Sequence, residues 1–308
     1  MTKLVKVVTD STSDLPPEIA RELGITIVPA YVHFGSQSYR DGVDITPEQM
    51  YERMLSGSVH PTTSSPAPGD FTDTYSSLAR ETDEIVCITV TSRQSAIYEA
   101  AMTGKQSFQG KCRVEVIDSR SVTMGLGLMA MLAAREARSG KALDEVVAAV
   151  RSAIPRTHGM ALLDTIKHAL KGGRLGRGGG LLGSLVKVKP VLDIKDGWIR
   201  LSGATRTRSS GMDRLCQCVT KHLPIEDAAV VHSNALREAE RLAERIRSLS
   251  PQTRPVIAKL GSALGVHGGP QSLVVVVRES KTEAERAAEK ESKAKRFTLP
   301  TLRIPHRQ

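Results

Sequence analysis

The stretch that decides the fold runs from Leu4 to Asp14 and reads Leu-Val-Lys-Val-Val-Thr-Asp-Ser-Thr-Ser-Asp. Its apolar, β-branched beginning, Leu4–Val8, predicts a buried strand. The short oxygen-bearing residues after it stand at the carboxyl end of that strand, where open α/β sheets bind ligands. They also suit a helix cap, and Asp14 or Ser13 would cap the helix predicted over 15–23, which has prolines in its first turn. Capping is the commoner role for such residues. The stretch therefore predicts a strand–loop–helix unit more strongly than it predicts a ligand-binding site.

Apolar strands and helical patterns alternate from this unit to about residue 153. Strands are expected over 25–34, 85–90 and 113–117, and helices over 46–54, 70–80, 95–107, 124–137 and 143–154. This alternation predicts an α/β fold with a doubly wound, mostly parallel sheet. Beyond it, after the glycine-rich loop 172–180, few-strand hairpins mixed with helices, with a tight-turn signal at Asp196-Gly197, predict a smaller α+β domain. We therefore expect an N-terminal α/β domain over 1–153, a C-terminal α+β domain over 154–279 and a charged tail without an apolar face over 280–308.

The amino-acid composition argues against nucleic-acid binding as the function. Only 3% of the 308 residues are aromatic, which disfavours a base-stacking platform for single-stranded nucleic acid and predicts an aliphatic core. The formal net charge of +10 suits nucleic acid, membrane headgroups or a phosphorylated ligand, but an ordinary basic protein is the commoner explanation. Since charge alone gives non-specific, salt-sensitive binding, we expect no specific nucleic-acid partner.

The cysteines and apolar runs indicate the compartment. The four cysteines, Cys87, Cys112, Cys216 and Cys218, lack the paired CxxC spacing of a zinc site, and we expect no metal. No apolar run reaches membrane-spanning length, and the N-terminus turns acidic too early for a secretory signal peptide. These features predict a cytoplasmic protein with no transmembrane segment.

Two hydroxyl-rich segments precede predicted helices. Residues 61–66 read Pro-Thr-Thr-Ser-Ser-Pro and include Thr63 and Ser64, whereas residues 91–95 read Thr-Ser-Arg-Gln-Ser and end at Ser95. Hydroxyl donors beside free amides at a helix start suit a carboxylate or a phosphate. Two capped helices are the alternative. The chain has neither a Walker-type phosphate loop nor a serine-nucleophile elbow, and we expect no cofactor.

Glycines accompany two further polar side chains. In Leu170-Lys-Gly-Gly-Arg174, the glycines let the backbone approach a ligand while the guanidinium faces an anion. In Gly265-Val-His-Gly-Gly-Pro270, a tight loop presents the imidazole of His267, although a lone loop histidine is more often inert. The remaining histidines considered show no spacing that assigns them to a site: His60, His158, His168, His222 and His232.

Taken in chain order, these segments resemble the DegV family, and the resemblance runs from about Val5 to Val277. It rests on eight motifs that are weak singly and strong in register. They are Thr9-Asp-Ser-Thr-Ser-Asp-Leu15, Thr63-Ser-Ser-Pro-Ala-Pro-Gly-Asp-Phe71, Ser92 to Tyr98, Val116-Ile-Asp-Ser119 with Gly125-Leu-Gly127, Lys171-Gly-Gly-Arg-Leu175, Lys189-Pro-Val-Leu192, Arg206-Thr and His267 to Pro270.

The resemblance implies a protein, itself not an enzyme, that encloses one long-chain fatty acid between its two domains. Several members of the family act as the binding subunit of bacterial fatty acid kinase, whose separate ATP-using subunit makes an acyl-phosphate for phospholipid synthesis. On this basis Thr63, Ser64, Ser95 and His267 would bind the ligand, with Thr63 and Ser95 hydrogen-bonding its carboxylate. Arg174, Arg206 and His267 would surround the carboxylate's mouth or contact the kinase subunit.

The chain departs from the family pattern beside the expected carboxylate. Ala96-Ile97 stands where the family usually has Gly-Thr, Ser65 where Gln is common, and Gln271 where Gly is expected. Ala96 narrows the space beside the carboxylate, and Ile97 removes a hydroxyl. The alternative function is therefore a lipid-binding carrier or regulatory module without a kinase partner.

Overall fold

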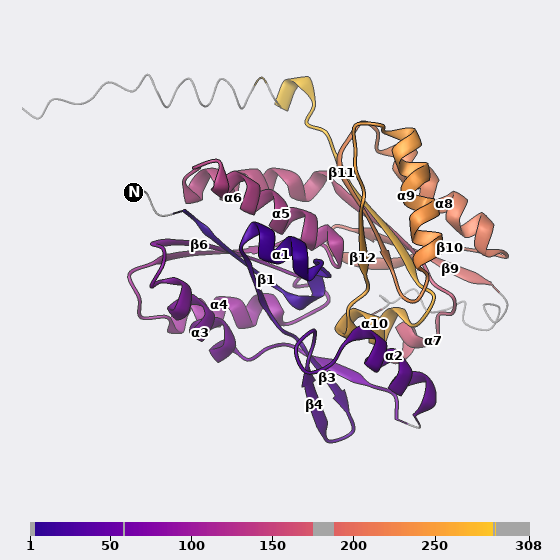
Figure 1. Ribbon diagram of the computed structural model, residues 1–308, viewed down its shortest axis with the longest axis horizontal. Helices are drawn as coiled ribbons and strands as arrows, with labels where there is room; N and C mark the ends of the chain where they lie inside the picture. Colours follow the sequence, from indigo (N-terminus) through magenta and orange to yellow (C-terminus); the bar gives the residue numbers. More distant parts are fainter. Residues whose placement is uncertain (1–3, 58, 175–187, 286, 288–308) are drawn as a thin grey trace, which may run out of the picture.

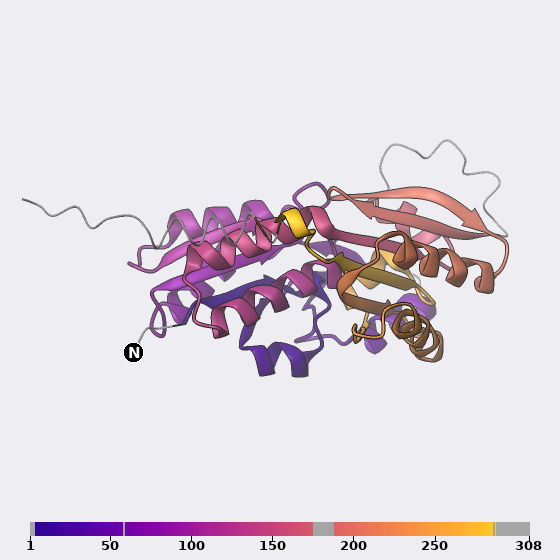
Figure 2. The ribbon, with the colours of Figure 1, turned by 90° about the horizontal axis from the view of Figure 1, so that it is seen from above.

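The structure is a computed structural model that describes residues 4–57, 59–174, 188–285 and 287 (Figure 1). The two parts of the chain predicted from sequence lie side by side along the long axis of the molecule (Figure 2). Most of the charged tail predicted over 280–308, and most of the glycine-rich stretch over 172–180, lie outside the described residues.

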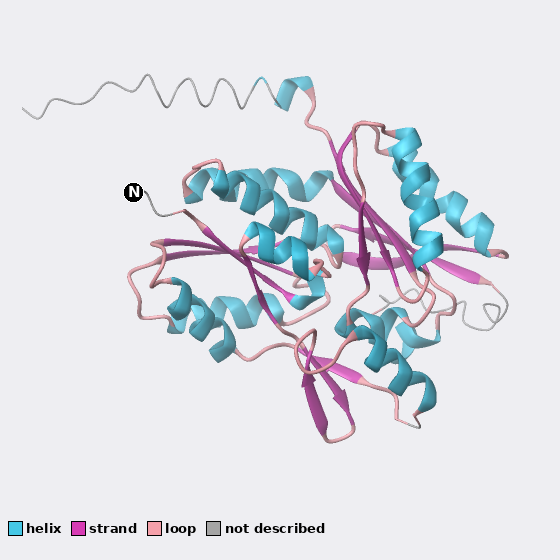
Figure 3. Cartoon of the chain, viewed as in Figure 1, coloured by secondary structure: helices cyan, strands magenta, loops and turns pink. Residues whose placement is uncertain are grey.

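The N-terminal part is built on a four-stranded parallel sheet in the order β2-β1-β6-β7. The strands are β1 (Lys6–Asp10), β2 (Ile25–Val28), β6 (Glu84–Thr89) and β7 (Arg113–Asp118). Helices cover both faces of this sheet, as Figure 3 shows. On one side lie α1 (Pro17–Leu23), α5 (Met124–Arg138) and α6 (Leu143–Ala153), and on the other α3 (Pro68–Leu78) and α4 (Ile97–Ser107). The predicted doubly wound parallel sheet is confirmed.

The C-terminal part has a six-stranded mixed sheet in the order β10-β9-β8-β13-β11-β12. Its strands are β8 (Thr157–Leu162), β9 (Lys189–Lys195), β10 (Trp198–Thr205), β11 (Ile225–His232), β12 (Val256–Lys259) and β13 (Leu273–Glu279). Among the strands that the structure describes in this sheet, only the β11–β12 pair is parallel. The helices are α7 (Lys167–Lys171), α8 (Arg208–Lys221), α9 (Leu236–Leu249) and α10 (Ser262–Gly268). The predicted α+β character is confirmed, but its sheet is wider than the N-terminal one.

A small third sheet was not anticipated from the sequence. The single strand predicted over 25–34 is two strands, because β2 ends at Val28 and β3 (Tyr31–Phe34) begins a separate sheet. In that sheet β3 pairs with β4 (Gln37–Arg40) and with β5 (Thr62–Ser64). Helix α2 (Pro47–Ser56) connects β4 to β5, and the Thr46 side chain caps its start by accepting a hydrogen bond from the amide of Gln49. Figure 1 shows α2 beneath α10.

Helix α5 joins the two large sheets. It is buried along most of its length, and its core neighbours include residues of both sheets. Glycines allow the close approach: a Cβ on Gly127 would lie 2.8 Å from the carbonyl oxygen of Ser13. A second apolar cluster packs α8 and α9 against the other face of the six-stranded sheet. Among the described residues, no helix combines the length and apolar character needed to cross a membrane.

Candidate functional site

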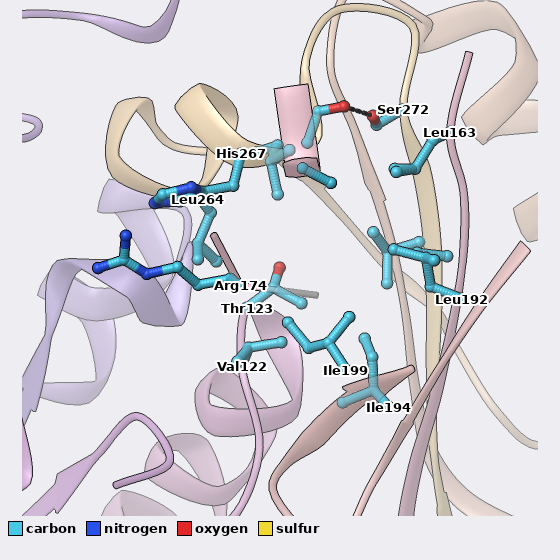
Figure 4. A pocket seen from close by; sticks show the side chains of 15 residues that line it. Val122, Thr123, Leu163, Arg174, Leu192, Ile194, Ile199, Leu264, His267 and Ser272 are labelled. Carbon is cyan, nitrogen blue, oxygen red and sulfur yellow. Dashed lines mark hydrogen bonds between the residues drawn. The ribbon is translucent and has the colours of Figure 1, made fainter. Parts of the chain in front are cut away.

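Two adjoining cavities lie between the sheets. The first has an almost entirely aliphatic wall and about 580 Å³ of atom-free space, counting its opening. Strands β8, β9, β10 and β13 and helix α10 supply most of this wall (Figure 4). Its lining residues include Ala161, Leu192, Ile194, Leu260 and Val274. The aliphatic, ring-poor composition therefore builds a cavity wall as well as a core.

The second cavity is rich in hydroxyl groups and holds about 970 Å³ on the same measure. Its polar wall comes from β5 and from the loop between β6 and α4, which contribute Thr63, Ser64, Ser92 and Ser95. The two cavities share five lining residues, Val122, Arg174, Ile199, Leu264 and His267. The shared residues make the arrangement an apolar chamber that ends at a polar one.

His267 stands where the two cavities meet. Its Nε2 lies 3.0 Å from the Thr63 hydroxyl, across a sequence separation of 204 residues. Burial, with a smaller contribution from the charge of Arg174, lowers the pKa of His267 to about 4. The ring is therefore neutral at pH 7. A neutral ring protonated on Nε2 would donate to Thr63 and leave the threonine hydroxyl free to donate into the polar cavity.

Ser95 lies just ahead of α4. Its hydroxyl oxygen accepts a hydrogen bond from the amide of Ile97, the first helical residue, at 3.3 Å. The serine is half-buried in the wall of the polar cavity, so its own hydroxyl proton remains available to a ligand. The start of a helix adds a favourable field for an anion at this point.

Ser64 and the two arginines differ in their placement. Ser64 is exposed in the polar cavity and its hydroxyl is also 2.8 Å from Nε2 of His33. Arg174 lines both cavities, and its Nη1 donates to the carbonyl of Gly172 at 2.6 Å. Arg206 is exposed at the turn between β10 and α8 and is not among the residues that line either cavity. The structure thus brings together Thr63, Ser64, Ser95, Arg174 and His267, but not Arg206.

Asp14 of the first motif and Asp41, which lies outside it, face inward and hold the start of α10. The Asp14 carboxylate accepts a hydrogen bond from the backbone amide of Gly261 at 2.9 Å, and the Asp41 carboxylate accepts one from the backbone amide of Ser262 at 3.0 Å. Burial raises the pKa of both carboxyls. The prediction that Asp14 or Ser13 caps the helix over 15–23 is wrong, since Pro16 occupies that cap position without a side-chain hydrogen bond. Asp14 instead caps a helix from the other end of the chain, a pairing that local sequence does not reveal.

A contact between the two parts of the chain also escaped the sequence analysis. The predicted hairpin turn at Asp196-Gly197 packs against the loop that leads to Ser95. The Thr91 hydroxyl donates to the carbonyl of Gly197 at 3.2 Å, and the guanidinium of Arg93 lies 5.2 Å from the ring centre of Trp198. This contact holds one wall of the polar cavity against β10.

The departures from the family pattern have distinct structural settings. Ala96 and Ile97 both line the polar cavity, the first exposed and the second buried. Gln271 has φ of 60°, the left-handed region that a glycine adopts without strain. The first two therefore alter the cavity wall, whereas Gln271 alters a turn.

The fold and the cavities define a class of α/β proteins that have an apolar chamber between two large sheets, closed by hydroxyl groups. A family model described as an uncharacterised protein, DegV family, matches residues 4–280. The chain belongs to the DegV family. It is 32% identical over 282 residues to a DegV domain-containing protein of Streptomyces coelicolor, covering 90% of this chain and 99% of that one.

Solved structures of similar proteins match nearly the whole chain. A DegV family protein from Thermus thermophilus, described by its fatty acid binding, has a TM-score of 0.84 and 26% identity, with 90% of this chain and 100% of that chain covered. DegV of Bacillus subtilis, described as a fatty acid binding protein, has a TM-score of 0.81 and 26% identity over 91% of this chain and 100% of that chain. A stearic acid-binding protein from Eubacterium ventriosum gives 0.80 and 26%, covering 90% and 99%.

Proposed function

We propose that the chain binds one long-chain fatty acid, with its alkyl chain in the apolar cavity and its carboxylate in the polar cavity. The observation that carries this proposal is the junction at His267, where an aliphatic chamber opens into a chamber lined by hydroxyl groups. Each methylene transferred from water to the aliphatic wall contributes about 0.8 kcal/mol. The described relatives that bind fatty acids support the same ligand class.

The carboxylate would accept hydrogen bonds from Thr63 and Ser95. His267 would orient the Thr63 hydroxyl through their 3.0 Å contact, and Arg174 would supply positive charge beside both cavities. Ser64 would add a hydroxyl at the more exposed side of the site. Hydrogen bonds to a charged group are worth about 1.5–3 kcal/mol each, so the carboxylate fixes which end of the ligand faces solvent.

Extraction of the purified protein followed by mass spectrometry tests the ligand class. We expect a co-purified fatty acid, or stoichiometric uptake of added fatty acid by the stripped protein. Thr63→Val and Ser95→Ala should each weaken binding roughly 10- to 150-fold, the equivalent of losing one charged hydrogen bond. Thr62→Val is the matched control, because Thr62 is the exposed neighbour on β5 and is not among the cavity-lining residues. No acyl ligand and no uptake would contradict the proposal.

We further propose that the bound carboxylate is presented to a separate ATP-dependent kinase subunit. A carboxylate oxygen would attack the γ-phosphorus of ATP, giving an acyl-phosphate and ADP, and this chain would need no cofactor of its own. Arg174 and His267 would act from the cavity mouth, whereas exposed Arg206 would contact the kinase subunit. Arg206→Ala should then leave fatty acid affinity unchanged and lower acyl-phosphate formation, while Arg247→Ala, an exposed arginine on α9, should change neither.

A carrier or regulatory module without a kinase partner is the second candidate. The observation that favours it is the altered wall of the polar cavity, where Ala96 and Ile97 replace the family's smaller and more polar pair. Acyl-phosphate formation with the kinase subunit of the same organism decides between the two. If the chain binds fatty acid but supports no acyl-phosphate formation, and Ala96→Gly with Ile97→Thr restores none, the carrier function holds.

A further inference from the structure

A second group of polar side chains lies on the six-stranded sheet, away from the lipid cavities. His158 is near the start of β8, Glu279 ends β13, and the cavity-lining residues Ala161 and Val274 lie toward the opposite ends of these two strands. His158 is paired with Val277 in register, so Glu279, two residues on, points to the same face of the sheet as His158. Helix α8 covers that face and delivers His222, its C-terminal cap residue, to the same place.

The three side chains converge on one carboxylate. Nδ1 of His222 lies 2.5 Å from Oε1 of Glu279, and Nε2 of His158 lies 3.3 Å from the same oxygen. The two imidazole rings are stacked, with centroids 3.8 Å apart. One donor atom from each of the three residues lies within 4.8 Å of the others. Side-chain exposure is 18% for His158, 15% for His222 and 35% for Glu279, so the cluster is sheltered but reachable from solvent.

From this geometry we propose that His158, His222 and Glu279 bind a divalent transition metal ion, with Zn²⁺ as the best match. Two imidazoles and one carboxylate form a set of zinc ligands that leaves a fourth position to water. Metal–ligand bonds of about 2.0–2.1 Å in a tetrahedron place ligand atoms roughly 3.3 Å apart. The His158–Glu279 separation already has this value, and the His222–Glu279 contact must open by about 0.8 Å. Both rings must also tilt from their stacked arrangement to aim their lone pairs at one ion.

The arginines near the Glu279 carboxylate pair with other groups, so this carboxylate contacts the two histidines. Arg278 pairs with Glu226 and Asp227, and Arg156 lies 3.6 Å from Glu226. Arg156 contacts Glu279 through the backbone carbonyl of Glu279, not through its carboxylate. Within the described residues, Nε2 of His158 is buried and makes no hydrogen bond of acceptable geometry. A metal ion would satisfy that nitrogen and join the ends of β8, β13 and α8.

Cobalt titration of the full-length chain, freed of metal and of any purification tag, tests the site. We expect one Co²⁺ per chain with the visible absorption of a tetrahedral complex, displacement of Co²⁺ by Zn²⁺, and a rise in melting temperature with Zn²⁺. His158→Asn and His222→Asn should abolish the tetrahedral spectrum, and Glu279→Gln should weaken binding at least tenfold. His33→Asn is the matched control, because His33 lies on β3 outside the cluster.

A cooperative thermal unfolding transition in each variant, His33→Asn included, reports independently that the variant is folded. Saturable tetrahedral binding that survives in His33→Asn and is lost in the three cluster variants supports the site. Absence of a tetrahedral spectrum, or an equal affinity in His158→Asn, would overturn it and leave a hydrogen-bonded clamp between helix and sheet. Since this test reads metal rather than lipid, its outcome is separable from that of the proposed function.

Discussion

Replacing Gly172 by alanine should displace His267 from its position at the junction of the two cavities. Gly172 caps α7 with φ of −76°, a conformation that alanine accepts, so the backbone itself does not resist the change. A Cβ there would lie 1.9 Å from Nδ1 of His267 and 2.8 Å from Cε1. Ordinary contact begins at 3.4 Å, so the ring must move by about 1.5 Å.

A shift of that size cannot preserve the 3.0 Å contact between His267 and Thr63. Losing one hydrogen bond costs about 0.5–1.5 kcal/mol, which predicts fatty acid binding roughly 2- to 13-fold weaker. The added methyl should also destabilise the folded protein by about 1–3 kcal/mol. Equilibrium binding of a fluorescent fatty acid, with thermal unfolding measured in parallel, separates the two effects.

Two further variants control this experiment. Gly69→Ala adds the same methyl in the first turn of α3, where nothing lies within 4 Å of the new Cβ, and should leave affinity unchanged. In a His267→Ala background, Gly172→Ala should cause no additional loss of affinity, because the displaced ring is already absent. Wild-type affinity in Gly172→Ala, or a fully additive double variant, would refute the role of His267 in orienting Thr63.

Three other predictions concern the elements that hold the site. Asp14→Ala should destabilise the protein by about 1–3 kcal/mol in chemical unfolding, because it leaves the half-buried amide of Gly261 unpaired. Asp14→Asn keeps the accepting oxygen and should cost less, and equal losses would contradict the capping role. In the unfolded chain His267 takes up a proton near pH 6.5, whereas in the folded protein it does so only near pH 4. The contribution of His267 to the free energy of unfolding is therefore complete above pH 6.5 and declines by about 3 kcal/mol as the pH falls to 4. The free energies of unfolding of wild type and His267→Gln, measured across this range, should show that difference, and parallel curves would exclude the lowered pKa of His267. Burial raises the pKa of Asp10 to about 6 and gives an opposite trend, which cancels when one curve is subtracted from the other. Arg93→Ala should shift the fluorescence of Trp198, the single tryptophan of the chain, to longer wavelength, and an unchanged spectrum would argue against the hairpin contact.

The sequence predicted the parts of the fold that depend on local pattern. The parallel strands and their helices follow from hydrophobic periodicity, and Thr63, Ser95, Arg174 and His267 were singled out by their motifs. Pattern failed where a partner is distant in sequence. Asp14 was predicted to cap the helix beside it, but it binds the N-cap residue of α10, Gly261, which lies 247 residues later. No local rule encodes that choice, because it depends on how α10 packs against the N-terminal part.

The same limit explains the histidines. His158 and His222 had no informative spacing, because 64 residues and the whole of β9, β10 and α8 separate them. Strand register and the length of α8 bring them together with Glu279. Arg206 shows the reverse case: its motif matches the family pattern, yet its side chain lies outside both cavities. A motif indicates that a residue type is required at a position. The fold determines whether that residue faces a ligand cavity or the protein surface.

Helix α10 makes the proposed lipid site depend on both halves of the chain. Its N-terminus is held by Asp14 and Asp41 from the N-terminal part, and its C-terminal turn carries His267 to Thr63 on β5. Its Leu264 lines both cavities. A boundary at residue 153 therefore divides the chain but not the site, because neither half supplies both the aliphatic wall and the hydroxyl groups. Since the ligand would contact groups from both halves, binding must stabilise their packing against each other, and loosening the α10 cap must in turn weaken binding.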